Sequence, residues 1–159
     1  MAKETSDTIF VSPVGKITPW ISRTIAEKVE DFFGFTTKVL PLLSDISFAY
    51  DPDRNQYHST LILEKLAARC PRGGLKVLAV TKEDLFIPIL THVYGEAQLG
   101  GTACILSISR LISGHDMGGV DSGASRIVKE AIHELGHCFD LRHCEDEHCI
   151  MHYCRKLAD

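Results

Sequence analysis

The sequence predicts a single α/β domain built on a twisted, mostly parallel β-sheet. Two observations carry this prediction: short β-type runs alternate with amphipathic helical segments, and no linker, repeat or low-complexity tract divides the chain. The length of 159 residues suits one domain with its own hydrophobic core and leaves little room for a second. We therefore expect residues 1–159 to fold as one unit.

The expected elements follow the chain in a regular order. They are a strand at 9–11, a helix at 20–33, a strand at 36–40, a helix at 56–69, strands at 75–81 and 102–108, and a helix at 125–139. Each helix has apolar residues at the spacing of one buried face, and each strand is rich in apolar and β-branched residues. The first helix has Thr18 as its expected N-cap, Pro19 at its first position and Gly34 at its end. From 140 to 159 the chain is polar, rich in Cys and His, and aperiodic.

Charge and composition exclude several classes of protein. The net charge of −4, from 17 basic and 21 acidic side chains, argues against a nucleic-acid partner. The first ten residues have no apolar core of a secretory signal, and no apolar stretch is long enough to cross a bilayer, so we expect a cytoplasmic monomer without a membrane partner. Six Cys in 159 residues is about 4%, which is below the roughly 8–10% that marks a disulfide scaffold. In a reducing compartment, clustered Cys and His more often bind metal than form disulfides.

Metal-ligand residue types are concentrated near the end of the sequence. Residues 133–154 hold five of the eight His and four of the six Cys. His133 and His137 lie four positions apart on the expected last helix, so both imidazoles leave one face, about 40° apart around the axis. Glu134 lies beside them but off that face, where it can reach a metal-bound water without being a ligand. This is the H-E-x-x-H arrangement of zinc hydrolases, and Zn²⁺ is the expected cofactor.

His143 is the expected third zinc ligand. It follows His137 by six residues, about 240° around a continued helix, so it can reach the metal only if the helix stops near Asp140 and the chain turns back. No strong helix signal follows Phe139. Three neutral imidazoles leave a fourth position open for water, whose proton Glu134 would take as general base and deliver to the leaving amine.

Beyond these residues the chain resembles a known family. The segment from His133 to His143, followed by Cys144, Cys149 and Met151, is similar to the archaemetzincins, a branch of the metzincin zinc metallopeptidases. Weaker similarities lie at 54–57, 95–101 and 128–131. The resemblance implies a single metzincin-like zinc-peptidase domain with a backing helix, an active-site helix and an antiparallel edge strand.

The same resemblance implies further site residues. Met151 would be the Met-turn residue, an apolar floor beneath the three zinc ligands. The run 102–108, approached through 95–101, would be an edge strand that holds a peptide substrate by main-chain pairing. Substrate contacts are expected at Glu96, Gly100 and Thr102, with Glu96 placed to meet an amino group.

Two features depart from the family pattern. Metzincins usually have Gly at the turn after the helix, where this chain has Asp140, one of the few other residues that tolerate a left-handed backbone. Archaemetzincins also carry a second, structural zinc on four Cys, of which Cys144 and Cys149 match two. In the family register Cys154 falls on a non-ligand position, and the second pair is missing; Cys154, His148 or His152 could complete a substitute site, or the thiols could stay free.

Peptide hydrolysis is therefore the expected activity, and two alternatives remain open. A zinc-stabilised binding protein with little or no hydrolysis would have its fourth zinc position closed by a protein ligand, such as a tail Cys. A zinc hydrolase that acts on a non-peptide amide would differ only in its substrate.

Overall fold

A five-stranded mixed sheet forms the centre of the computed structural model, which describes residues 7–112 and 119–152. Its strand order is β2-β1-β5-β8-β7. The strands are β1 (Thr8–Val14), β2 (Thr36–Val39), β5 (Gly74–Thr81), β7 (Gly95–Ala97) and β8 (Ala103–Ser107). Four run parallel and β7 pairs antiparallel with β8 at one edge. The predicted α/β class and the antiparallel edge strand are confirmed.

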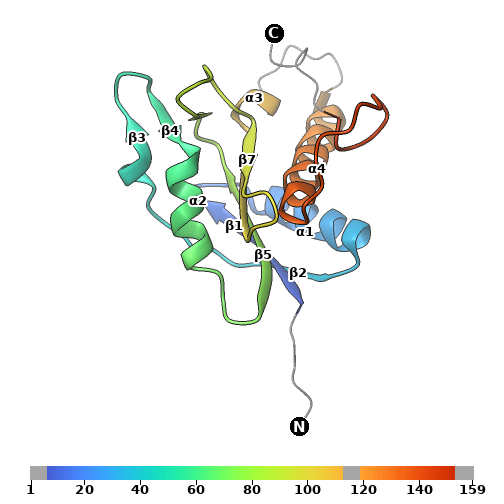
Figure 1. Ribbon diagram of the computed structural model, residues 1–159. Helices are drawn as coiled ribbons and strands as arrows, with labels where there is room; N and C mark the ends of the chain where they lie inside the picture. Colours follow the sequence, from blue (N-terminus) through green and yellow to red (C-terminus); the bar gives the residue numbers. More distant parts are fainter. Residues whose placement is uncertain (1–6, 113–118, 153–159) are drawn as a thin grey trace.

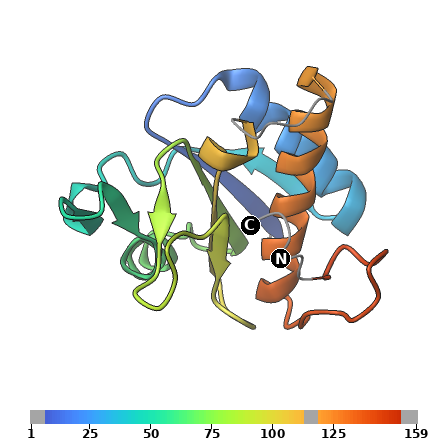
Figure 2. The same cartoon turned by 90° about the horizontal axis from the view of Figure 1, so that it is seen from above.

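Helices cover both faces of this sheet (Figure 1 and Figure 2). They are α1 (Pro19–Phe33), α2 (Ser59–Ala68), the short α3 (Ser109–Ile112) and α4 (Gly119–Cys138). Leu78 and Val80 of β5 pack in one core with α1 and α4, while Val77 and Ala79 pack in the other with α2. Successive side chains of a strand point to opposite faces, so a central strand that is apolar throughout contributes side chains to two separate cores.

A second, smaller sheet lies beside α2. Its order is β3-β4-β6, from β3 (Tyr50–Asp51), β4 (Gln56–His58) and β6 (Leu85–Phe86), with the short 3-10 helix η1 (Ser47–Ala49) before it. These strands have two or three residues each, which is too short to leave a periodic pattern in the sequence. The predicted helix at 56–69 therefore starts too early: its first three residues are β4, and α2 begins at Ser59.

The predicted edge strand at 102–108 is wrong in position. This run forms β8, which lies between β5 and β7 inside the sheet, and the edge is β7. All five residues of β8 are buried, as an interior strand requires.

The first helix ends as predicted but begins without its expected cap. Pro19 opens α1 and Gly34 ends it in the left-handed region at φ 79°. The Thr18 side chain makes no capping hydrogen bond. No described helix has the length and apolar character needed to span a membrane.

Candidate metal centre

The final turns of α4 bring two of the predicted ligands together. His133 and His137 lie one turn apart, and their Nε2 atoms are 3.2 Å from each other. Each ring is oriented through its other nitrogen: Nδ1 of His133 donates to the Ile150 carbonyl at 2.9 Å, and Nδ1 of His137 donates to the Leu141 carbonyl at 2.7 Å. A carbonyl can only accept, so both Nε2 atoms carry a lone pair directed at the same point.

A left-handed residue after α4 turns the chain back toward the histidines. Asp140 has φ 69°, as the sequence predicted. The amide of Leu141 bonds the Gly136 carbonyl and that of Asp140 bonds the His137 carbonyl, both at 2.9 Å. These paired bonds are a Schellman motif, which ends the helix and satisfies its last carbonyls. The reversal places Nε2 of His143 at 3.2 Å from Nε2 of His137.

The three imidazoles fit a tetrahedral zinc ion. Their ligand nitrogens all lie within 4.8 Å of one another. Zn–N bonds of about 2.0–2.1 Å at tetrahedral angles put neighbouring ligand nitrogens about 3.3–3.4 Å apart, close to the 3.2 Å between His137 and each of its two partners. Lone pairs that converge at this spacing repel one another unless a cation lies between them.

His133 is buried, His137 is half-buried and His143 is exposed, and the surroundings of all three favour the neutral imidazole. Removal from water lowers the pKa of His133, His137 and His143 below the ordinary value, and mutual repulsion adds to this at His137 and His143. Neutral imidazole is the form that coordinates zinc.

Glu134 is buried beside the triad with one oxygen unused. The residue is only 5% exposed, and its Oε2 atom has no hydrogen-bond partner within the described part of the protein. Burial raises the pKa of Glu134 well above its usual range, and the nearby carboxylate of Glu130 raises it further. A carboxyl group next to the histidines in sequence and on the same helix can serve as a base for a water or substrate at the metal, and a bound dication would lower this pKa again.

Edge strand β7 crosses directly against Glu134. A Cβ placed on Gly95 would lie 3.0 Å from Cγ of Glu134 and 2.6 Å from the Ile105 carbonyl oxygen, so only glycine fits there. Gly95 was not among the predicted site residues, because nothing in its local sequence shows which side chain it faces.

One side of the β7 backbone has no strand partner among the described residues. Tyr94 and Gln98 direct main-chain groups toward β8, and Glu96 pairs with Ile105 in the same register. Because main-chain groups alternate in direction along a strand, those of Gly95 and Ala97 point away from β8. Among the described residues β7 has no second strand neighbour.

The segment after His143 folds back beneath α4. Met151 is 4% exposed, and a Cβ on Gly136 would lie 2.5 Å from its Sδ atom, so glycine in the middle of the histidine motif makes room for this methionine. The Met151 carbonyl accepts the amide of Cys144 at 2.9 Å and closes the loop. Met151 therefore packs against α4 at Gly136, and its expected role as a floor beneath the three ligands stays a prediction.

Residues predicted for a second zinc site lie along the same loop. Cys144 and Cys149 are partly buried; the Met151 amide bonds Sγ of Cys149 at 3.4 Å, and Nδ1 of His152 donates to the Cys144 carbonyl at 2.9 Å. Within residues 7–112 and 119–152, the histidine triad is the one cluster of three potential metal ligands. Cys154 lies outside the described residues, so the second site stays a prediction.

The predicted substrate residues each have partners inside the protein. The Glu96 carboxylate accepts hydrogen bonds from the hydroxyls of Ser59 and Thr60 at the start of α2. The Gly100 amide bonds the His137 carbonyl at 2.9 Å, and the Thr102 carbonyl accepts the Val77 amide. As substrate contacts, Glu96, Gly100 and Thr102 stay predictions.

Two histidines and a buried glutamate on a helix behind a sheet edge, with a third histidine after the turn that ends the helix, are typical of zinc metallopeptidases. Comparison with known proteins agrees: the model of peptidase family M54 matches residues 69–159. The chain belongs to this family and is a zinc metallopeptidase, a hydrolase.

Curated relatives carry the name that the sequence resemblance indicated. The archaemetzincin of Methanocaldococcus jannaschii is 34% identical over 155 residues, which cover 95% of this chain and 83% of the relative. The archaemetzincin of Pyrococcus furiosus is 34% identical over 161 residues, covering 96% and 84%.

Solved structures show the same fold. Archaemetzincin from Archaeoglobus fulgidus, complexed with malonate, superposes with a TM-score of 0.77 at 32% identity, covering 95% of this chain and 98% of the other. A zinc-dependent peptidase from Methanocorpusculum labreanum superposes with a TM-score of 0.81 at 27% identity, covering 94% and 90%.

Proposed function

We propose that this protein hydrolyses peptide bonds at one zinc ion held by His133, His137 and His143, with Glu134 as the general base. The observation that carries the proposal is the convergence of three imidazole nitrogens, two of the pairs at 3.2 Å, beside the buried carboxyl of Glu134. The whole described fold serves this site as one peptidase domain.

Bound zinc supplies Lewis acidity, which makes a water more acidic and polarises a substrate carbonyl. Glu134 takes the proton of the attacking water on its carboxylate and delivers it to the leaving amine. The Ile150 and Leu141 carbonyls keep the rings of His133 and His137 in one tautomer through the cycle.

The free side of β7 holds the substrate. A peptide that pairs antiparallel with Gly95 and Ala97 brings its main chain over Glu134, because Gly95 packs against that side chain. Main-chain hydrogen bonds do not depend on the identity of the side chains, so peptides of many sequences can bind in this way. Met151 packs under α4 and supports the turn that carries His143.

A Glu134→Gln variant tests the proposal. It keeps the shape of the side chain and removes the base, so we expect about one zinc per chain, an unchanged Tm, and a fall in kcat/KM of about 10²–10⁴ on a peptide pool. Glu64→Gln, the same change on an exposed residue of α2, is the matched control and should keep full activity.

Two results would contradict the proposal. Full activity in Glu134→Gln would remove this residue from the chemistry. Wild-type protein that binds zinc yet cleaves no peptide would favour the zinc-stabilised binding protein, and cleavage of acylated amines alone would favour the hydrolase of non-peptide amides.

A further inference from the structure

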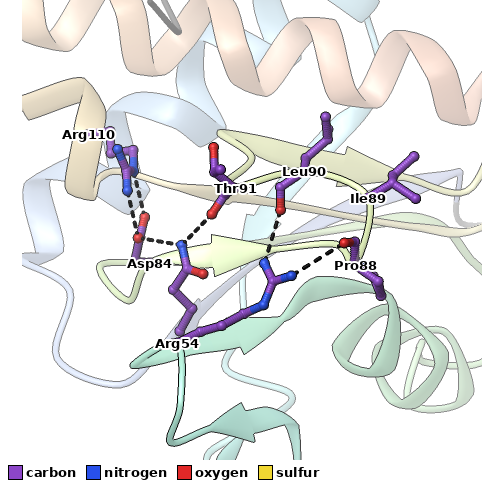
Figure 3. Close-up of a pocket in the computed structure, with 8 residues that line it drawn as sticks. Arg54, Asp84, Pro88, Ile89, Leu90, Thr91 and Arg110 are labelled. Atoms are coloured by element: carbon purple, nitrogen blue, oxygen red, sulfur yellow. Dashed lines mark hydrogen bonds and ion pairs between the residues drawn. The ribbon is translucent and has the colours of Figure 1, made fainter.

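A hollow of about 500 Å³ lies at the end of the sheet where β7 begins, and none of the three histidines lines it. The segment between β6 and β7 forms one wall with Pro88, Ile89 and Leu90 (Figure 3). Arg54 reaches it from the turn between β3 and β4, and Arg110 reaches it from α3. The proposed reaction uses none of these side chains.

The two arginines differ in what neutralises them. Arg110 forms a two-pronged ion pair with Asp84 at 2.8 and 3.0 Å, which cancels both charges. The guanidinium of the exposed Arg54 donates to the neutral carbonyls of Leu90 at 3.0 Å and Pro88 at 3.3 Å, and only the backbone amide of Arg54 bonds a carboxylate, that of Asp51 at 3.3 Å. Within the described part of the chain no carboxylate lies at ion-pair distance from Arg54. The hollow is therefore net positive.

Arg54 is also held in place with donors to spare. Its guanidinium carbon lies 4.2 Å from the centre of the Phe86 ring, and its two carbonyl bonds fix the plane of the group. Two of its five N–H groups are used, so a further acceptor can bind. A planar fork held in this way is suited to a carboxylate, which it can bind through two parallel hydrogen bonds.

The hollow lies in the path of a bound peptide. A peptide antiparallel to β7 runs toward the start of that strand with the residues that follow the bond to be cleaved. Thr91, which lines the hollow, precedes Gly95 by four residues, so the two are at most about 14 Å apart along the chain. At most about four or five extended residues after the cleaved bond are needed to cover that distance.

We propose that this hollow binds a carboxylate on the C-terminal side of the cleaved bond, through Arg54. The carboxylate is either an acidic side chain or the C-terminal carboxylate of the peptide. Ile89 is 86% exposed and offers an apolar surface to the stem of that residue. The proposal rests on the proposed function, because β7 sets the direction of the peptide.

Binding to the zinc-loaded Glu134→Gln protein tests this without turnover. In one arm, labelled peptides with a free C-terminus are compared with the same peptides amidated; in the other, amidated peptides carry Glu or Gln at successive positions. We expect the carboxylate member of at least one arm to bind about three- to tenfold more tightly, with the ratio falling toward one in high salt.

Adding Arg54→Gln should bring the ratio of the two affinities, for the carboxylate peptide and for its neutral counterpart, near one. Arg72→Gln, which removes the same charge from an exposed residue between α2 and β5, is the matched control and should leave the ratio unchanged. Equal affinities in both arms would overturn the proposal, and so would a ratio that survives Arg54→Gln. A variant that weakens acidic and neutral peptides by the same factor would show that Arg54 only positions the loop.

Cleavage by the wild-type protein locates the preference. We expect a carboxylate, from Glu or from the C-terminus of the peptide, to be favoured after the cleaved bond, and a preference before that bond would overturn the proposed site. If the wild-type protein cleaves no peptide while the binding ratio depends on Arg54, the proposed function fails and the carboxylate site stands. If cleavage requires Glu134 but no carboxylate is favoured, the proposed function stands and the carboxylate site fails.

Discussion

Replacing Gly95 by alanine tests whether β7 must lie directly against Glu134. The new Cβ would lie 2.6 Å from the Ile105 carbonyl oxygen, where ordinary contacts are 3.4–4 Å, so β7 and β8 would have to separate by about 0.8 Å. The same Cβ would lie 3.0 and 3.2 Å from two carbons of the Glu134 side chain. The backbone oxygen cannot move alone, since it belongs to an interior strand.

The displacement has two measurable consequences. Overpacking of this kind costs about 1–3 kcal/mol, and each kcal/mol lowers Tm by about 2–4 °C in a domain of this size. A shift approaching 1 Å in the general base or in the substrate strand costs about 10²-fold in rate. Zinc content should not change, because the atoms nearest to the added Cβ belong to Ile105 and Glu134 and not to a histidine.

The assay compares Tm, zinc per chain and kcat/KM of Gly95→Ala with wild type. Gly123→Ala is the matched control: no atom lies within 4 Å of its added Cβ, and alanine in α4 should raise stability by about 0.5–1 kcal/mol. A Gly95→Ala variant with wild-type Tm and kcat/KM within twofold would refute the close contact between β7 and Glu134.

Three further predictions follow from the same structure. Asp140→Gly should raise stability by about 0.5–1 kcal/mol in thermal denaturation because it relieves φ 69°, whereas Asp140→Val should lower it and weaken zinc binding; equal effects would contradict the turn geometry. Burial alone would raise the pKa of Asp84, but hydrogen bonds from Arg110 and Gln56 hold it below the ordinary 3.8. The stabilisation from this pair is present above about pH 4 and is lost as pH falls through that lowered pKa, so Asp84→Asn should flatten the acid limb of a stability–pH curve, and an unchanged limb would count against the pair. Removing zinc with a chelator should lower Tm and speed amide exchange at 140–152, since a zinc ion held by His143 would tie that segment to α4; an exchange rate that does not depend on zinc would refute this.

Much of the metal centre was predictable because it depends on local geometry. The helical period alone places His133 and His137 on one face, and the steric tolerance of Asp for the left-handed region allowed the turn at Asp140. The structure shows both features. Gly34 and Pro19 bound α1 for equally local reasons.

Features that depend on strand order were predicted poorly. The run 102–108 has the same apolar pattern whether it lies at an edge or inside the sheet, so its interior position as β8 could not be read from its residues. The strands β3, β4 and β6 form only through pairing with each other and show no period of their own. The hydrogen bonds of Arg54 to residues 34 and 36 positions away are equally invisible in the sequence.

The sequence by itself determined the residues of the candidate zinc site: the potential ligand types, the spacing of the first two histidines, the adjacent glutamate and a residue able to turn the chain. Each follows from backbone sterics and a 3.6-residue period, which act within a few positions. Only the tertiary structure decided what surrounds those residues: β7 lies at the edge of the sheet, Gly95 packs against Glu134, Met151 packs against Gly136, and a positive hollow lies where β7 begins. These depend on which segments meet across the fold, and that is set by the packing of the whole core rather than by any stretch of chain.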